Sequence, residues 1–254
     1  MTRLNVLREG RGPFVVLSHA LGCDLHMWDG VAAELSRAHT VLRYDHRNHG
    51  QSERLPGPLT MQMLADDAAE MIEREAAGEP VHFVGLSMGG MTGQALAISN
   101  EKLLRSLVIA NSSAHYTDTS PWKSRIETVR AQGVKAIAAG AVGRWLTPDF
   151  MATPEGAAAG AKLQKTLEQC DSAGYAASCE AVAAIDFRAS NRNIAVPTLV
   201  IAGSRDEATP PSMSEEMVAA IPKARLASID AAHLSAVEQP VAFTALLIDF
   251  WRSL

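Results

Sequence analysis

The amino-acid sequence predicts an α/β fold, with a mostly parallel central sheet, helices on both faces and a helical cap insertion. Two observations lead to this prediction. Short apolar runs bounded by turn residues alternate with segments of helical periodicity, which is typical of buried strands joined by crossover helices. One long stretch, residues 121–185, breaks the alternation because it is rich in alanine and helical in pattern, with no convincing strand. It is too long for a structureless connection, so we expect a helical insertion.

Five apolar runs and one weaker candidate are the predicted strands. They occupy residues 13–18, 40–44, 81–85, 106–110 and 197–202, with the weaker run at 224–230. Between the second and third runs, Leu64, Ala68, Met71 and Ile72 fall on one face of a helix over residues 60–74, and Thr60 can cap its start.

These elements divide the chain into a core and a cap. We assign residues 1–120 and 186–254 to the core, and residues 121–185 to the cap. Ligands of open α/β sheets bind at the carboxyl ends of the strands, so the cap should stand over the site.

Length and composition exclude several classes of protein. The 254 residues are 47% hydrophobic and 20% charged, as expected of a globular protein with a sizeable core. A net charge of -5 disfavours nucleic-acid binding, and no apolar run approaches the roughly 18 residues of a membrane span. Three irregularly spaced cysteines suggest no disulfide framework, and the first residues show no signal-peptide pattern. We therefore expect a cytoplasmic protein.

One serine lies among four glycines in the stretch VHFVGLSMGGMTGQALAI, residues 81–98. Its centre, GLSMG, fits the pattern G-x-S-x-G at the end of a predicted strand and the start of a helical segment. That context is typical of a nucleophile elbow, a sharp turn that exposes the serine hydroxyl. An ordinary strand-to-helix turn also uses glycine and serine, so the interpretation of Ser87 as a nucleophile depends on a base and an acid.

His233 and Asp206 are the predicted base and acid. His233 follows the last predicted strand, in a loop at the same sheet edge as Ser87, and its alternative role is that of a structural loop histidine. Asp206 is the first acid after the fifth apolar run, and Glu207 and Asp230 are its rivals. The resulting order of serine, aspartate and histidine is the one expected of a catalytic triad on this kind of sheet.

Acyl transfer also needs N–H donors for the oxyanion. The N–H of Met88 directly follows the serine at the start of a helix, where the dipole favours negative charge. The second donor is expected from the loop SHALGC, residues 18–23, after the first apolar run. We assign it to the backbone N–H of Leu21.

No cofactor or metal is expected. The segment DHRNH, residues 45–49, and His19 with Asp24 and His26 contain metal-ligand residue types but no converging set with matched spacing. Neither G-x-G-x-x-G after the first run nor G-x-x-x-x-G-K-[ST] is present. The predicted partner is a small molecule.

The sequence resembles the 3-oxoadipate enol-lactonases of the α/β-hydrolase superfamily over nearly its whole length. The similar segments are residues 41–52, 82–97, 197–203 and 233–240 in the core, and the more particular residues 143–150 and 174–180 in the cap. The resemblance implies an α/β-hydrolase fold and the triad Ser87, Asp206 and His233. It also implies hydrolysis of a five-membered enol lactone to 3-oxoadipate, in bacterial breakdown of aromatic compounds.

The chain departs from that family in several places. His46 stands where threonine is common, Asn48 replaces the glycine of R-G-H-G, and SHALG with Ala20 replaces S-N-S-L-G. An arginine often found a few residues after Cys179 is missing. The short N-terminus leads us to expect that the first strand of the usual fold is absent.

The predicted cap is cationic. Residues 121–145 hold five cations, Lys123, Arg125, Arg130, Lys135 and Arg144, against the single acid Glu127. A solvated helix face would explain such charges, but a cationic cap would also concentrate an anionic substrate. We select Arg144 to pair with a substrate carboxylate because it precedes the apolar Trp145, and we add Trp122 and Trp145 as substrate-binding residues.

The function predicted from these residues is a cofactor-independent serine hydrolase acting on a small ester or lactone. The alternatives are a carboxylesterase or C–C bond hydrolase of the same fold, and a ligand-binding protein without turnover. The sequence does not indicate an oligomeric state.

Overall fold

A seven-stranded sheet forms the centre of the molecule. The computed structural model describes residues 2–254, and its strands follow the order β1-β3-β2-β4-β5-β6-β7. β1 pairs antiparallel with β3, and every other pair of neighbours is parallel. The strands are β1 (Val6–Glu9), β2 (Phe14–Ser18), β3 (Thr40–Tyr44), β4 (Val81–Leu86), β5 (Leu104–Ala110), β6 (Thr198–Gly203) and β7 (Ala224–Ile229). All six predicted strands are present, including the weaker candidate.

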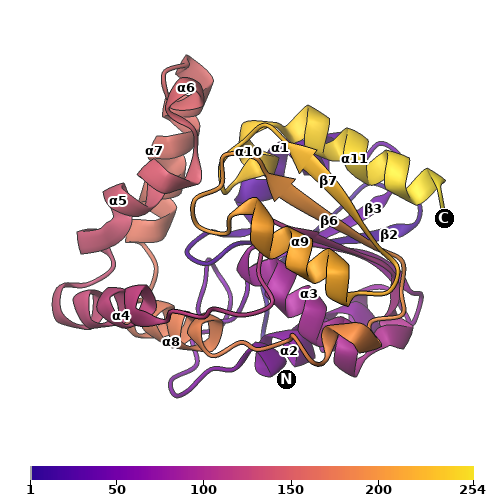
Figure 1. Cartoon of the computed structure of the whole chain (residues 1–254), viewed down its shortest axis with the longest axis horizontal. Coiled ribbons are helices and arrows are strands. Elements are labelled where there is room, and N and C mark those ends of the chain that lie inside the picture. Colours follow the sequence, from indigo (N-terminus) through magenta and orange to yellow (C-terminus); the bar gives the residue numbers. More distant parts are fainter. Residues whose placement is uncertain (1) are drawn as a thin grey trace.

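Helices cover both faces of this sheet (Figure 1). One face carries α1 (Asp29–Leu35) and α11 (Pro240–Arg252), and the other carries α2 (Met61–Glu75), α3 (Met88–Ser99) and α9 (Pro211–Ala220). Four short helical turns complete the core: η1 (Leu25–Trp28), η2 (Glu101–Leu103), η3 (Asn191–Asn193) and α10 (Ser235–Glu238). None of the helices in residues 2–254 is long and apolar enough to cross a membrane.

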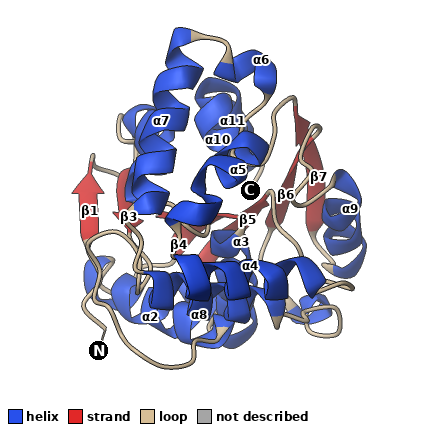
Figure 2. Ribbon diagram, turned by 90° about the vertical axis from the view of Figure 1, so that its left-hand side faces the viewer, coloured by secondary structure: helices blue, strands red, loops and turns tan. Residues whose placement is uncertain are grey.

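A helical insertion separates β5 from β6. Its helices are α4 (Ser120–Gln132), α5 (Lys135–Trp145), α6 (Pro148–Met151), α7 (Pro154–Glu168) and α8 (Ser172–Ala183). Figure 1 shows them at the left of the sheet, on the side toward which the β6 and β7 arrowheads point, and Figure 2 views them face on. The insertion therefore stands over the carboxyl ends of the strands. The predicted α/β-hydrolase fold with its helical insertion is confirmed.

The edge strand β1 was not among the predicted strands, and residues 2–5 before it form no strand. Residues 6–9 form β1, which pairs with β3 through the register Val6 with Tyr44 and Leu7 with Arg43. All four residues of β1 are partly or fully exposed because the strand lies at the edge of the sheet. An edge strand of this kind has no continuous apolar run, and it was therefore not visible in the hydrophobic pattern.

The predicted helix over residues 60–74 is α2. Thr60 caps it, since its Oγ1 accepts the Met63 N–H at 3.2 Å. Leu64, Met71 and Ile72 are fully buried, so the apolar face faces the core as its spacing predicts.

Candidate active site

Ser87 lies on the turn that joins β4 to α3. Its backbone has φ 57° and ψ -116°, outside the regions that residues with side chains usually adopt, and such a conformation costs about 1–3 kcal/mol. Neighbouring β5 and the loop after it hold the turn in place. The Ser87 N–H donates to Ala110 O at 2.9 Å, and Ser112 Oγ donates to Ser87 O at 2.8 Å.

The glycines around Ser87 are required by close packing. A Cβ on Gly85 would lie 2.1 Å from the carbonyl oxygen of Gly89, and a Cβ on Gly89 would lie 2.1 Å from that of Ser18. Both obstacles are backbone atoms, which cannot rotate away as a side chain can. The glycines let α3 approach β2 and β4 closely enough to form the sharp turn.

Ser87, His233 and Asp206 form a continuous hydrogen-bonded chain. His233 Nε2 lies 3.0 Å from Ser87 Oγ, and His233 Nδ1 lies 2.9 Å from Asp206 Oδ2. Because an ionised carboxylate only accepts hydrogen bonds, we assign the ring proton to Nδ1, which leaves the Nε2 lone pair facing the serine hydroxyl. This is the arrangement in which a histidine can take the proton of an attacking serine.

The Asp206 carboxylate is held as an anion. His233 Nδ1, Thr209 Oγ1 and Asn111 Nδ2 donate to its Oδ2 at 2.9, 2.7 and 3.0 Å, and the N–H groups of Ala208 and Thr209 donate to its Oδ1. Burial raises the pKa of this carboxyl, but the electrostatic interaction with His233 and these hydrogen bonds outweigh burial and lower the pKa to about 2.

The two rival carboxylates lie elsewhere. Asp230 accepts from Arg205 Nε at 2.9 Å and Nη2 at 3.2 Å, and its side chain is 75% exposed. Glu207 lines the cavity beside Ser87. Within residues 2–254, neither makes a hydrogen bond to His233.

The predicted oxyanion donors lie beside Ser87 in two different elements. Met88 is the first residue of α3, so its N–H has no acceptor within the helix. Leu21 lies in the loop after β2 and lines the same cavity as Ser87. Among the hydrogen bonds of residues 2–254, no acceptor takes the N–H of Leu21. Neither N–H has an acceptor among the described residues, as an oxyanion donor requires.

A cavity of about 370 Å³ lies over Ser87. Trp122, Trp145 and Arg144, the predicted substrate-binding residues, all line it. Arg125 lines it as well, with its guanidinium 4.7 Å from the centre of the Trp122 ring. Sequence reasoning counted Arg125 among the cap cations without selecting it, although its spacing of three residues from Trp122 on one helix places both on the same face. The remaining lining residues are Tyr116, Asp118, Pro121, Glu207, Ala208, Thr209, Pro210 and Met213, with Leu21 and His233.

Comparison with known proteins agrees with the observed fold. The sequence model of the alpha/beta hydrolase family matches residues 15–246. The chain belongs to the α/β-hydrolase family. It is 36% identical to 3-oxoadipate enol-lactonase 2 of Acinetobacter baylyi over 91% of this chain and 85% of that one. The crystal structure of the enol-lactonase from Burkholderia xenovorans superimposes with a TM-score of 0.94 at 36% identity, covering 99% of this chain and 97% of that one. A thermophilic esterase from Thermogutta terrifontis, with malate bound, gives a TM-score of 0.92 at 28% identity, covering 99% and 94%.

In this α/β hydrolase, three buried histidines surround the loop that carries Leu21. The ring centres of His19 and His46 are 4.6 Å apart, and those of His19 and His49 are 5.2 Å apart. His19 Nδ1 lies 2.8 Å from Ala20 O, and the Gly22 N–H donates to His49 Nε2 at 3.1 Å. Two imidazoles therefore hold the backbone on both sides of Leu21.

These imidazoles are neutral in the folded protein. Burial lowers the pKa of His19 and His46 below the ordinary histidine range, and it lowers the pKa of His49 to about 3. A neutral His49 is required for its Nε2 to accept the Gly22 N–H. His46 and Ala20, two departures from the family pattern, thus belong to the packing around the loop that carries Leu21.

The loop of His233 is held by Asn111, which sequence reasoning missed. Asn111 Nδ2 donates to Ala232 O at 3.2 Å as well as to Asp206, and Ser235 Oγ lies 2.5 Å from Asn111 Oδ1. Asn111 adopts φ 46° directly after β5. Its place at the carboxyl end of a central strand was the only signal in the sequence, because its partners are distant along the chain.

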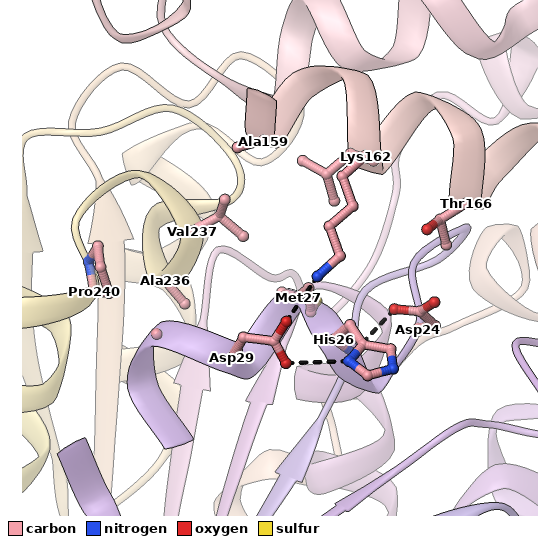
Figure 3. Close-up of a pocket in the computed structure, with 12 residues that line it drawn as sticks. Asp24, His26, Met27, Asp29, Ala159, Lys162, Thr166, Ala236, Val237 and Pro240 are labelled. Atoms are coloured by element: carbon pink, nitrogen blue, oxygen red, sulfur yellow. Dashed lines mark hydrogen bonds and ion pairs between the residues drawn. The ribbon is translucent and has the colours of Figure 1, made fainter. Parts of the chain in front are cut away.

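A second, smaller cavity of about 140 Å³ lies between α7 and the core, away from Ser87 (Figure 3). Lys162 of α7 reaches across it to Asp29 at 2.7 Å, and Asp29 also accepts from Arg43 at 2.6 Å and contacts His26 Nδ1 at 3.2 Å.

Nowhere in residues 2–254 do three His, Cys, Asp or Glu side chains gather in a way that could hold a metal ion.

Proposed function

We propose that this protein is a serine hydrolase that opens a small anionic lactone, such as 3-oxoadipate enol-lactone, through an acyl-enzyme on Ser87. The observation that carries the proposal is the hydrogen-bonded chain from Ser87 through His233 to Asp206, at a cavity that also contains two arginines. The identity of 36% to an enol-lactonase over most of both chains supports the choice of substrate class.

The first half of the reaction forms the acyl-enzyme. His233 Nε2 takes the proton of Ser87 Oγ as this oxygen attacks the lactone carbonyl. The carbonyl oxygen becomes an anion that the N–H groups of Leu21 and Met88 stabilise. The ring C–O bond then breaks, and the enolate oxygen leaves with the proton that His233 Nε2 took from Ser87; the resulting enol becomes a ketone, and His233 is neutral again.

The second half returns the free enzyme. Water gives a proton to His233 and attacks the serine ester, and His233 passes the proton back to Ser87 Oγ as the acid leaves. Asp206 remains an anion throughout and holds the imidazole with its proton on Nδ1.

The insertion would act as the cap of this site. α4 contributes Trp122 and Arg125, and α5 contributes Arg144 and Trp145, so residues 121–185 would supply substrate contacts while the core supplies the chemistry. Guanidinium groups can bind a carboxylate through paired hydrogen bonds. The malate bound to the related Thermogutta esterase is a dicarboxylate and agrees with an anionic ligand.

A carboxylesterase is the second candidate. Trp122, Trp145, Tyr116 and Met213 give the cavity an aromatic and apolar wall that suits a neutral ester, and a related protein is an esterase. A C–C bond hydrolase and a ligand-binding protein that lacks turnover are the remaining alternatives. The intact hydrogen-bonded chain argues against the binding protein.

A substrate panel with the variant Ser87→Ala tests the proposal. Wild-type protein should hydrolyse an enol lactone that bears a carboxylate faster than a saturated lactone or a p-nitrophenyl ester. Ser87→Ala should abolish turnover and leave the fold unchanged, as judged by circular dichroism. Residual activity above about one per cent of wild type would show that Ser87 is not the nucleophile.

A further inference from the structure

Glu238 is a buried carboxylate at the end of α10, and it contacts the insertion as well as the core. Only 6% of the residue is exposed to solvent. Among the ion pairs of residues 2–254, none includes Glu238. A buried carboxylate without a cation is costly unless several hydrogen bonds compensate for lost water.

Three donors satisfy this carboxylate, and they come from two different parts of the molecule. The Ala232 N–H donates to Glu238 Oε2 at 3.2 Å, from the residue directly before His233. The Thr147 N–H donates to the same oxygen at 3.1 Å, and the Thr147 hydroxyl donates to Oε1. Thr147 follows α5 and caps α6, so Glu238 joins the insertion to the loop of His233.

A second contact joins the same two segments. The Leu234 N–H, on the other side of His233, donates to Trp145 O at 2.9 Å. Both neighbours of His233 are therefore fixed. Ala232 donates to Glu238, which also binds Thr147, and Leu234 donates to Trp145. The side chain of Trp145 lines the cavity over Ser87, so the segment that contacts a substrate also holds the histidine loop.

From these contacts we propose that Glu238 is a positioning residue that ties the His233 loop to the base of the insertion and so sets the distance from His233 Nε2 to Ser87 Oγ. The inference rests on the proposed function, because it requires His233 to act as the base. Proton transfer depends steeply on this geometry, and a misplacement of about 1 Å can cost about 100-fold in rate.

Glu238→Leu is the variant that tests this role, because it keeps the side chain's approximate size and removes both acceptor oxygens. We expect kcat to fall about tenfold or more, while KM changes less than about twofold because no substrate contact is lost. The downfield proton resonance of His233 Nδ1–H, hydrogen-bonded to Asp206, should shift or broaden. In Glu238→Gln, the amide oxygen can still accept the two N–H groups, and the amide NH2 can donate to Thr147 Oγ1. This variant should therefore keep kcat within about threefold of wild type.

Thr147→Val provides a second test that leaves the carboxylate in place. It removes the hydroxyl that binds Glu238 and also the cap of α6, and kcat should fall about threefold. Thr153→Val is its matched control, because Thr153 caps α7 through the Gly156 N–H at 3.0 Å and has no hydrogen bond to Glu238. The control should lose thermal stability and keep the wild-type kcat.

The outcomes separate this inference from the proposed function. Turnover that survives Ser87→Ala contradicts the proposed function. If turnover depends on Ser87 and Glu238→Leu keeps kcat within twofold of wild type, Glu238 is structural only and the inference fails. If Glu238→Leu does not fold, equal kcat values for Thr147→Val and Thr153→Val overturn the inference, and a loss confined to Thr147→Val supports it.

Discussion

Asp206 and Asp230 are the same type of residue, and both follow a strand, yet their surroundings give them different roles. Asp206 is buried with five hydrogen-bond donors around it, one of which is His233. Asp230 is exposed and binds Arg205, a surface ion pair of the kind that contributes little to stability. The sequence favoured Asp206 as the acid of the triad but kept Asp230 as a rival. The contacts of the two side chains in the structure distinguish them.

Substituting these two aspartates provides a matched test. Asp206→Asn presents an amide to the imidazole and favours the wrong histidine tautomer, so kcat should fall by about 10⁴-fold. Asp230→Asn should leave kcat within about twofold of wild type, because it alters only a surface pair. Steady-state kinetics on one ester substrate checks both values. If the two losses were reversed, the acid of the triad would be Asp230.

Arg144 is expected to recognise the charge of the substrate. Arg144→Ala should lower kcat/KM for a carboxylate-bearing lactone by about tenfold or more, consistent with the loss of roughly 1.5–3 kcal/mol from a charged hydrogen bond. A neutral ester should lose much less. Arg125→Ala should show the same selectivity, since Arg125 lines the same cavity.

Arg130→Ala is the control for this charge effect. Arg130 lies on α4 as Arg125 does, but it binds Glu180 at 2.6 Å outside the cavity of Ser87. Its removal should affect both substrates equally and slightly. Equal losses on both substrates for Arg144→Ala would mean that Arg144 stabilises the insertion and does not bind the carboxylate.

At the scale of elements, the close contact of α3 with the sheet creates the turn at Ser87. The helix begins directly after the strained residue, and Gly89 lies against the carbonyl of Ser18 on β2. This contact also explains why the glycines cannot be exchanged for good helix formers, although glycine lowers helix stability by about 1 kcal/mol.

Alanine at two helical glycines should therefore have opposite effects. Gly89→Ala places a Cβ 2.1 Å from a backbone oxygen and should destabilise the fold by about 3 kcal/mol or more. Gly140→Ala, in α5, meets no atom within 4 Å and should stabilise it by about 0.5–1 kcal/mol. Urea unfolding of both variants measures the difference. A Gly89→Ala protein of wild-type stability would contradict the packing argument.

At the scale of the whole molecule, buried neutral histidines make stability depend on pH. The pKa values of His19, His46 and His49 are lowered by burial, so each is neutral when folded and takes up a proton on unfolding below about pH 6.5. Their contribution to stability is complete above that pH and is lost as the pH falls toward the folded pKa, about 3 for His49. Asp206, with a pKa of about 2, loses its contribution only below about pH 4.

We expect the free energy of unfolding to fall as the pH drops from about 6 to 5, since each histidine that takes up a proton only on unfolding contributes about 1.4 kcal/mol per pH unit. His49→Asn should reduce this slope by about one such contribution, whatever its effect on stability at pH 7. Urea titrations at several pH values measure the slope. A free energy that stays constant from pH 7 to pH 5 would show that these imidazoles do not control acid stability.

Much of the fold and the central residues of the site were accessible to sequence reasoning because their signals are local. A buried strand needs a short apolar run, and a nucleophile elbow needs small residues within two or three positions of the serine. Parallel strands bring their carboxyl ends to one edge, so the loops that hold Ser87, Asp206 and His233 could be assigned to the same edge before any distance was known.

From the sequence alone came six of the seven strands, the presence of a helical insertion and the candidate order Ser87, Asp206, His233. The polar residues that support these three became visible only in the tertiary structure. Asn111 and Ser235 are 124 positions apart, and Thr147 and Glu238 are 91 positions apart, so no local pattern predicts their contacts. The physical reason is that a hydrogen bond requires its two atoms to meet within about 3 Å, and for distant segments only the packing of the sheet and the insertion sets that distance.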